Sequence, residues 1–182
     1  PATNALLVLP PRVDGPYVGG MIYAPGAFVR VRDLETPGVF PGVGGSLRAG
    51  EAVLRWLTIG VEITGTLAYQ GDQRLGQGAL IVDFGFLPLP RLPLSLHAGF
   101  GVGGGAVRQQ GIAGRSGFGG AVFKGAVRYD FFPFAAKKRP RRGGGFGLGP
   151  ELGWIGFTPA AAGRPMSNTV YLGLGMGFFF GS

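Results

Sequence analysis

The chain of 182 residues contains 38 Gly and 15 Pro, a single His and no Cys, and 46% of its residues are hydrophobic. Charged residues make up only 14%, against roughly 25% in an ordinary soluble domain, which disfavours a well-solvated globule. The apolar content argues against a disordered chain. The lack of Cys excludes disulfides and thiolate metal sites, and one His makes a His-based metal cluster implausible, so we expect neither metal nor cofactor.

The net charge of +8 comes mostly from one basic run rather than from a basic face. We therefore expect no nucleic-acid partner. If the chain crosses a membrane as paired strands, counting the strands places the run on the same side as the N-terminus, which we take to be the periplasmic side, where it would bind anionic lipid headgroups. Two alternatives stay open: a solvated turn without a partner, or an external loop if the count is off by one. The run consists of Lys137, Lys138, Arg139, Arg141 and Arg142.

Strict alternation of apolar with polar or small residues recurs along the chain and predicts long β-strands. The clearest case spans residues 53–69, where Ile59 and Val61 share one face while Gly60 and Glu62 share the other. Such a strand exceeds the about 5 to 6 residues typical of soluble sheets and is long enough to cross a bilayer at a tilt. In chain order, the predicted strands span residues 17–31, 39–49, 53–69, 76–87, 92–107, 117–132, 145–157 and 169–180.

Eight alternating segments predict an all-β fold, a transmembrane antiparallel up-and-down β-barrel of eight strands. In hydrocarbon every backbone polar group must be paired within the protein, so only helices and closed barrels span the membrane. The sequence contains no run of 18 apolar residues, so it predicts no membrane-spanning helix. We expect residues 1–16 to form an N-terminal periplasmic segment and residues 17–182 the barrel. The even strand count places both termini on one side, which we take to be the periplasm.

Aromatic residues on the predicted lipid-facing parity gather at the two ends of the strands. Such belts are typical of the water interfaces of a membrane barrel. Tyr69 and Trp154 fall toward one rim. The opposite rim receives Tyr17, Phe86, Tyr129, Phe131, Phe146, Phe178 and Phe180.

On this pattern, residues 17–182 resemble the small eight-stranded outer-membrane β-barrels of Gram-negative bacteria, of the OmpA and OmpX type. The segment 170–180 ends in three Phe residues and resembles the terminal strand that the barrel-assembly machinery recognises in that family, although Gly181 and Ser182 follow it. The resemblance implies location in the cell outer membrane. Its implied partners are outer-membrane lipids and, during biogenesis, the assembly machinery.

The predicted inward face carries acids and bases together, and a charge in a narrow lumen needs a partner or water. We expect an internal ion-pair network, with Glu62 or Asp83 bound to Arg128 or Arg48; an ion or proton path lined by the same groups is the alternative. The network is predicted to comprise Arg48, Glu62, Asp83, His97, Arg128, Asp130 and Glu151, and Arg30 and Lys124 share its parity.

Many inward positions are glycine, which leaves two interpretations of the lumen. Inward aromatic residues, for which Trp56, Tyr171 and Phe179 are the candidates, would lie over the glycines. Alternatively, the glycines would line a cavity for a ligand or a peptide. The apolar segment 5–11 is expected to plug the lumen, lie on the periplasmic rim or bind a partner.

Ser95, His97 and Asp83 share the inward parity and have the residue types of a hydrolase triad. A separation of two residues on one strand is a common coincidence, so we expect a hydrogen-bonded lumen pair and no enzyme. The alternative is a lipid acyl hydrolase.

Short predicted external connections disfavour a large extracellular ligand. The sequence therefore favours a structural or partner-anchoring role in the cell envelope, with an envelope or periplasmic protein as partner. A narrow pore, or a carrier of a small or apolar ligand, is the alternative.

The predicted parity can be tested by placing one charge on each face of the third strand. Val61→Arg puts a cation on the lipid-facing side near mid-strand and should cost about 2–4 kcal/mol of unfolding free energy. Thr64→Arg lies on the inward parity, so its cost should differ and depend on its neighbours. Urea unfolding in lipid vesicles measures both, and equal penalties would contradict the barrel interpretation of this strand.

Overall fold

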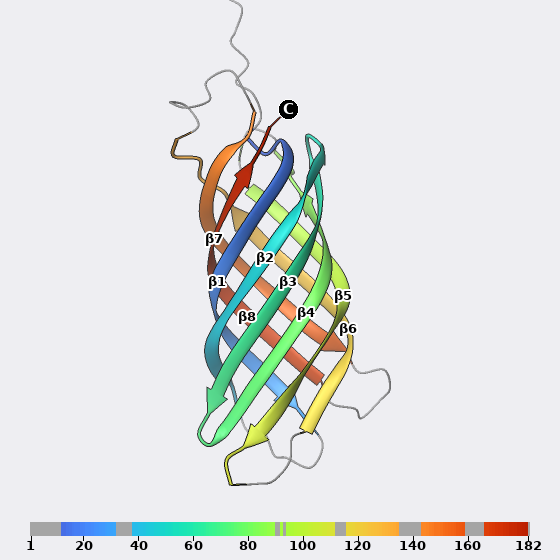
Figure 1. Ribbon diagram of the computed structural model, residues 1–182, viewed down its shortest axis with the longest axis vertical. Helices are drawn as coiled ribbons and strands as arrows, with labels where there is room; N and C mark the ends of the chain where they lie inside the picture. The colour runs from blue at the N-terminus through green and yellow to red at the C-terminus, as the bar shows by residue number, and fades with distance from the viewer. Residues whose placement is uncertain are drawn as a thin grey trace, which may run out of the picture.

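The computed structural model describes residues 12–31, 38–89, 92, 94–111, 116–134, 143–158 and 166–181. Within these residues the chain forms a closed barrel of eight consecutive antiparallel strands, which Figure 1 shows from the side. None of the described residues forms a helix long and apolar enough to cross a membrane. The strands are β1 (Gly15–Arg30), β2 (Phe40–Leu54), β3 (Leu57–Gln70), β4 (Gln73–Phe86), β5 (Leu94–Gln109), β6 (Ser116–Tyr129), β7 (Gly145–Thr158) and β8 (Met166–Phe179).

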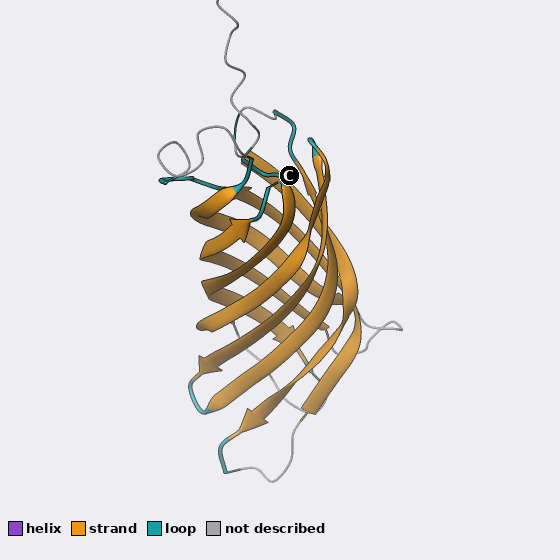
Figure 2. Cartoon of the chain, turned by 45° about the horizontal axis from the view of Figure 1, so that its top comes forward, coloured by secondary structure: helices purple, strands orange, loops and turns teal. Residues whose placement is uncertain are grey.

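Closure depends on β1, which pairs with β2 along one side and with β8 along the other. Its partners on β8 run from Phe179, opposite Tyr17, to Met166, opposite Arg30. No described strand is therefore left as an open edge, and the strands coil around the barrel at a tilt (Figure 2). We call the end of the barrel where β1 begins and β8 ends the terminal mouth; the C-terminus is marked there in Figure 1.

The outer surface of the barrel is apolar over its middle. Leu47 and Ile22 on neighbouring strands are 71% and 70% exposed, and every strand contributes further large apolar side chains to the same surface. Exposed charged side chains on the strands, such as Arg30, Glu51 and Arg74, lie toward the strand ends. In water such a surface would aggregate, whereas in a bilayer it contacts acyl chains.

Eight predicted strands are present, but three side chains point differently from the prediction. Tyr17 is buried in the lumen rather than lipid-facing, while Arg30 is exposed rather than inward. Trp56 lies in the turn between β2 and β3, where it is half exposed and stacks on Phe86. For Tyr17 and Arg30, apolar neighbours made the local parity ambiguous, and the pairing of the strands decides it. Trp56 differs because the predicted strand 53–69 is interrupted by a turn, with β2 ending at Leu54 and β3 beginning at Leu57.

The lumen is filled by side chains, as expected for a barrel of eight strands. Two hydrophobic clusters occupy it away from the terminal mouth. The first lies around mid-strand and contains Met21, Tyr23, Ala79, Ile81, Val122, Ile155, Phe157 and Tyr171. The second lies toward the opposite end and contains Ala27, Val29, Val31, Phe40, Ala68, Leu75 and Val107.

Inward glycines make room for the tyrosine rings of the lumen. A Cβ atom at Gly44 would overlap the ring of Tyr23, and one at Gly153 would overlap the hydroxyl end of Tyr171. The two rings themselves pack with centroids 4.9 Å apart. The glycines therefore accommodate aromatic side chains rather than lining an empty cavity at this level.

We predict that Gly44→Ala lowers the free energy of unfolding by about 1 to 3 kcal/mol, because the added methyl group meets the Tyr23 ring inside a packed lumen. Gly65→Ala is the matched control, since this glycine faces outward and the nearest atom to an added Cβ lies 4.0 Å away. Urea titration of the folded barrel in vesicles gives both values. An equal, small effect at the two positions would show that the Tyr23 ring is free to move aside.

Candidate functional site

Charged side chains gather in the lumen between the mid-strand cluster and the terminal mouth. Strand register sets this level: Arg48 on β2 lies directly opposite Glu62 on β3, and Arg128 on β6 lies opposite Glu151 on β7. Each of these side chains is nearly or wholly buried. Charges buried in this way are tolerated only when they are paired and hydrogen-bonded.

Lys124 is the centre of this network. Its ammonium group lies 2.5 Å from a carboxylate oxygen of Glu62, 3.3 Å from one of Glu151 and 3.7 Å from one of Asp83. The three acids come from β3, β7 and β4, so one side chain from β6 joins carboxylates around most of the barrel wall. The lysine thereby compensates charges that a narrow lumen could not otherwise hold without water.

Two arginines complete the network on the other side. Arg48 donates to Glu151 at 3.1 Å, and Tyr171 donates its hydroxyl to the second oxygen of the same carboxylate at 2.8 Å. Arg128 holds Asp130 through two nitrogens, at 2.7 and 2.6 Å. Both nitrogens contact the same oxygen, Oδ1, so the arginine fork converges on one side of the Asp130 carboxylate.

A linear hydrogen-bonded chain of Asp83, His97 and Ser95 borders the network. The Asp83 carboxylate lies 2.6 Å from Nδ1 of His97, and Nε2 of the same ring lies 2.9 Å from Oγ of Ser95. Because a carboxylate only accepts, the tautomer of the uncharged imidazole that fits both contacts has its proton on Nδ1 and leaves Nε2 to accept from the serine. Both distances fall within the range of a nucleophile, a base and an orienting acid.

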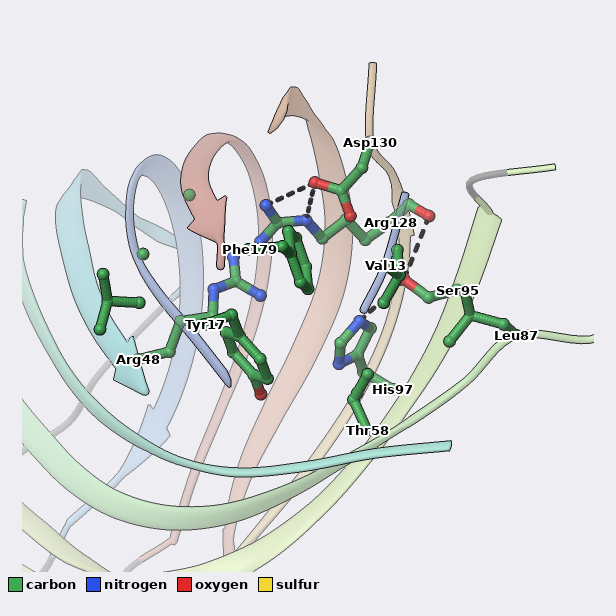
Figure 3. A pocket seen from close by; sticks show the side chains of 13 residues that line it. Val13, Tyr17, Arg48, Thr58, Leu87, Ser95, His97, Arg128, Asp130 and Phe179 are labelled. Atoms are coloured by element: carbon green, nitrogen blue, oxygen red, sulfur yellow. Dashed lines mark hydrogen bonds and ion pairs between the residues drawn. The ribbon is translucent and has the colours of Figure 1, made fainter. Parts of the chain in front are cut away.

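Ser95 and His97 line a small cavity at the terminal mouth, shown in Figure 3. The cavity measures about 30 Å³, which is room for about two water molecules. Ser95, His97 and Arg48 line its inner part, while Val13 and Leu87 come from outside the strands. The serine thus shares the cavity with apolar and aromatic side chains, among them Tyr17 and Phe179, and with the charged side chains of Arg128 and Asp130.

The structure brings together all seven residues of the predicted network, but with different partners. At least one of Glu62 and Asp83 was expected to make an inward ion pair, with Arg128 or Arg48 as the partner; both acids do make one, but with Lys124. Lys124 was recognised only by its inward parity, and sequence alone gave no reason to place it at the centre. The basic run at Lys137, Lys138, Arg139, Arg141 and Arg142 lies outside the described residues, and so does the apolar segment 5–11.

Comparison with solved structures agrees with this architecture. The attachment invasion locus protein Ail of Yersinia pestis superposes with a TM-score of 0.59 at 12% identity, covering 91% of this chain and 99% of that chain. Its complex with the heparin analogue sucrose octasulfate gives a TM-score of 0.57 at 12% identity, with coverages of 90% and 99%. Neisserial surface protein A (NspA) gives 0.57 at 14% identity, with coverages of 92% and 98%.

No protein-family model and no curated protein matches the sequence. The chain therefore has the fold of the small, eight-stranded outer-membrane β-barrels, and the structural likeness extends over nearly its whole length. At this level of identity the likeness concerns the fold. A role has to be argued from the lumen and surface of this chain itself.

The network predicts strong coupling between Lys124 and Glu62. Lys124→Met leaves three carboxylates short of a cation and should lower the free energy of unfolding by about 3–5 kcal/mol. Adding Glu62→Gln removes one of the uncompensated charges, so the double variant should lose less than the sum of the two single losses. Urea unfolding of all four proteins in vesicles completes the cycle. Additive losses would show that the two groups are separately hydrated and would favour a water-filled path.

Proposed function

We propose that the chain spans the outer membrane of a Gram-negative cell, with both termini in the periplasm, and serves a structural or partner-anchoring role rather than forming a pore. The observation that carries this proposal is the filled lumen. A buried ion-pair network lies on one side of the mid-strand cluster, and a second hydrophobic cluster lies on the other.

The exterior supports the membrane part of the proposal. Large apolar side chains cover the middle of the barrel, and aromatic side chains stand near its ends, among them Tyr69, Tyr129 and Phe180. The last strand ends with outward Phe178 beside Phe180, whose rings meet edge to face with centroids 5.2 Å apart. This terminal strand is the segment that we propose the assembly machinery engages.

A partner-anchoring role would use the terminal mouth. β6 ends and β7 begins at this end of the barrel, and the sequence between them includes the basic run at residues 137–142. We propose that these five basic residues bind anionic headgroups of the inner leaflet, each contributing about 1 kcal/mol near the surface. An envelope protein would then bind at the terminal mouth, next to the lipid-bound basic run.

Conductance in planar bilayers tests the filled lumen. The purified, refolded full chain should show no stable open channel, because the layers that fill the lumen are built from the strands themselves. Tyr23→Ala combined with Tyr171→Ala removes the two packed rings of the mid-strand cluster and should raise conductance. Phe28→Ala removes an outward aromatic side chain from the same strand as Tyr23 and should produce no measurable conductance.

Deletion of residues 1–11 extends the same measurement to the N-terminal segment. The deleted chain should remain closed, since closure does not depend on that segment. A stable open channel in the full chain would contradict the proposal and make transport of a small solute the leading function. A channel that appears only after the deletion would instead identify the segment as a plug.

A further inference from the structure

We propose that Ser95, His97 and Asp83 form a nucleophilic triad that hydrolyses short-chain carboxylic esters at the terminal mouth. The residues lie in a linear chain with separations of 2.9 Å from serine Oγ to His97 Nε2 and 2.6 Å from Nδ1 to Asp83. The neighbouring strands β4 and β5 hold all three, with Asp83 opposite Gly99 and His97 opposite Gly85. Rigid strands thus fix the relative positions of the three groups.

The surroundings of the serine distinguish this arrangement from a hydrogen bond that merely fills the lumen. Ser95 lines a cavity at the mouth rather than lying in the packed centre of the network. Arg48 lines the same cavity, and its buried Nε–H has no hydrogen-bond partner among the described residues. The guanidinium is fixed by its ion pair with Glu151 through Nη2, which leaves the Nε–H as the donor for an oxygen that becomes negatively charged during acyl transfer.

The reaction proceeds in two balanced halves. Ser95 Oγ attacks the carbonyl carbon of the ester while His97 Nε2 takes the serine proton; the bond from acyl carbon to alcohol oxygen breaks, and the alcohol leaves with that proton. Water then attacks the acyl-serine, His97 takes a proton from it, and the carboxylic acid leaves as Ser95 recovers its hydroxyl. His97 acts as base and acid, and Asp83 is a positioning residue for its ring.

The cavity also limits the substrate. About 30 Å³ beside the serine accepts only a small acyl group, while the alcohol portion must extend through the mouth past Val13 and Leu87. Acetyl and propionyl esters therefore fit the site better than long-chain esters. The Ser95 hydroxyl has a second possible acceptor, the carbonyl oxygen of Arg128 at 3.5 Å. A serine that donated to this carbonyl would be unreactive, but the contact is long for a hydrogen bond.

The decisive test uses the full, refolded chain with a fluorophosphonate probe and p-nitrophenyl esters of increasing acyl length. We expect one adduct per chain, mapped to Ser95 by mass spectrometry, and faster hydrolysis of the acetate than of the octanoate. Ser95→Ala should abolish the adduct and lower the hydrolysis rate by roughly 100-fold or more. Ser46→Ala is the matched control, because both serines are buried, inward and 6% exposed, and Ser46 Oγ has no partner among the described residues.

Asp83→Asn tests the positioning role. It should lower kcat while KM changes less than about twofold, since Asp83 does not line the cavity and acts on the reaction through the His97 tautomer. The substitution also removes the charge that faces Lys124, so its effect on stability is measured in parallel. The heat-dependent shift of the folded band on a gel identifies variants that have lost the barrel. The absence of an adduct on the folded wild-type chain overturns the proposal without reference to any variant. So does an adduct that persists in Ser95→Ala, or equal hydrolysis rates for Ser95→Ala and the wild type.

Discussion

The closed hydrogen-bond ladder is the constraint on which the rest of this structure depends. A strand in hydrocarbon has no water to satisfy its backbone, so the first strand must meet the last. Here β1 pairs with β8 over its whole length, and eight strands then enclose a lumen too narrow to be left unfilled. The sequence composition follows from this constraint: bulky apolar side chains lie outside, and the lumen holds glycines, packed apolar and aromatic side chains, and paired charges.

The lumen charges are stable because they compensate one another across the barrel. Lys124 joins acids from three other strands, and Arg48 and Tyr171 converge on the two oxygens of Glu151. Removing one member exposes the others to a medium that solvates them poorly. The network therefore acts as a set of cross-links from within, adding to the ladder contacts that only the folded, closed barrel can make.

Strand positions and most side-chain directions could be predicted from the sequence because alternation is a local property with a period of two. It failed where neighbours were alike: Tyr17 precedes Val18, and Arg30 follows Phe28 and Val29. Ion-pair partners could not be predicted, since Lys124 and Glu62 meet across the lumen from β6 and β3. That meeting depends on the stagger of the closed sheet, which no single strand encodes.

Asp83 connects the stability of the barrel to the chemistry proposed for its mouth. Lys124 lies 3.7 Å from one oxygen of this carboxylate, and His97 lies 2.6 Å from the other. The ammonium group favours the ionised carboxylate electrostatically, and the hydrogen bond from the other oxygen to Nδ1 orients the ring so that Nε2 faces Ser95. Electrostatic stabilisation of an acyl transfer requires groups that are oriented before the substrate arrives. The ion pairs that fill the lumen would supply that orientation, so the charges that stabilise the closed barrel are compatible with the chemistry proposed for Ser95.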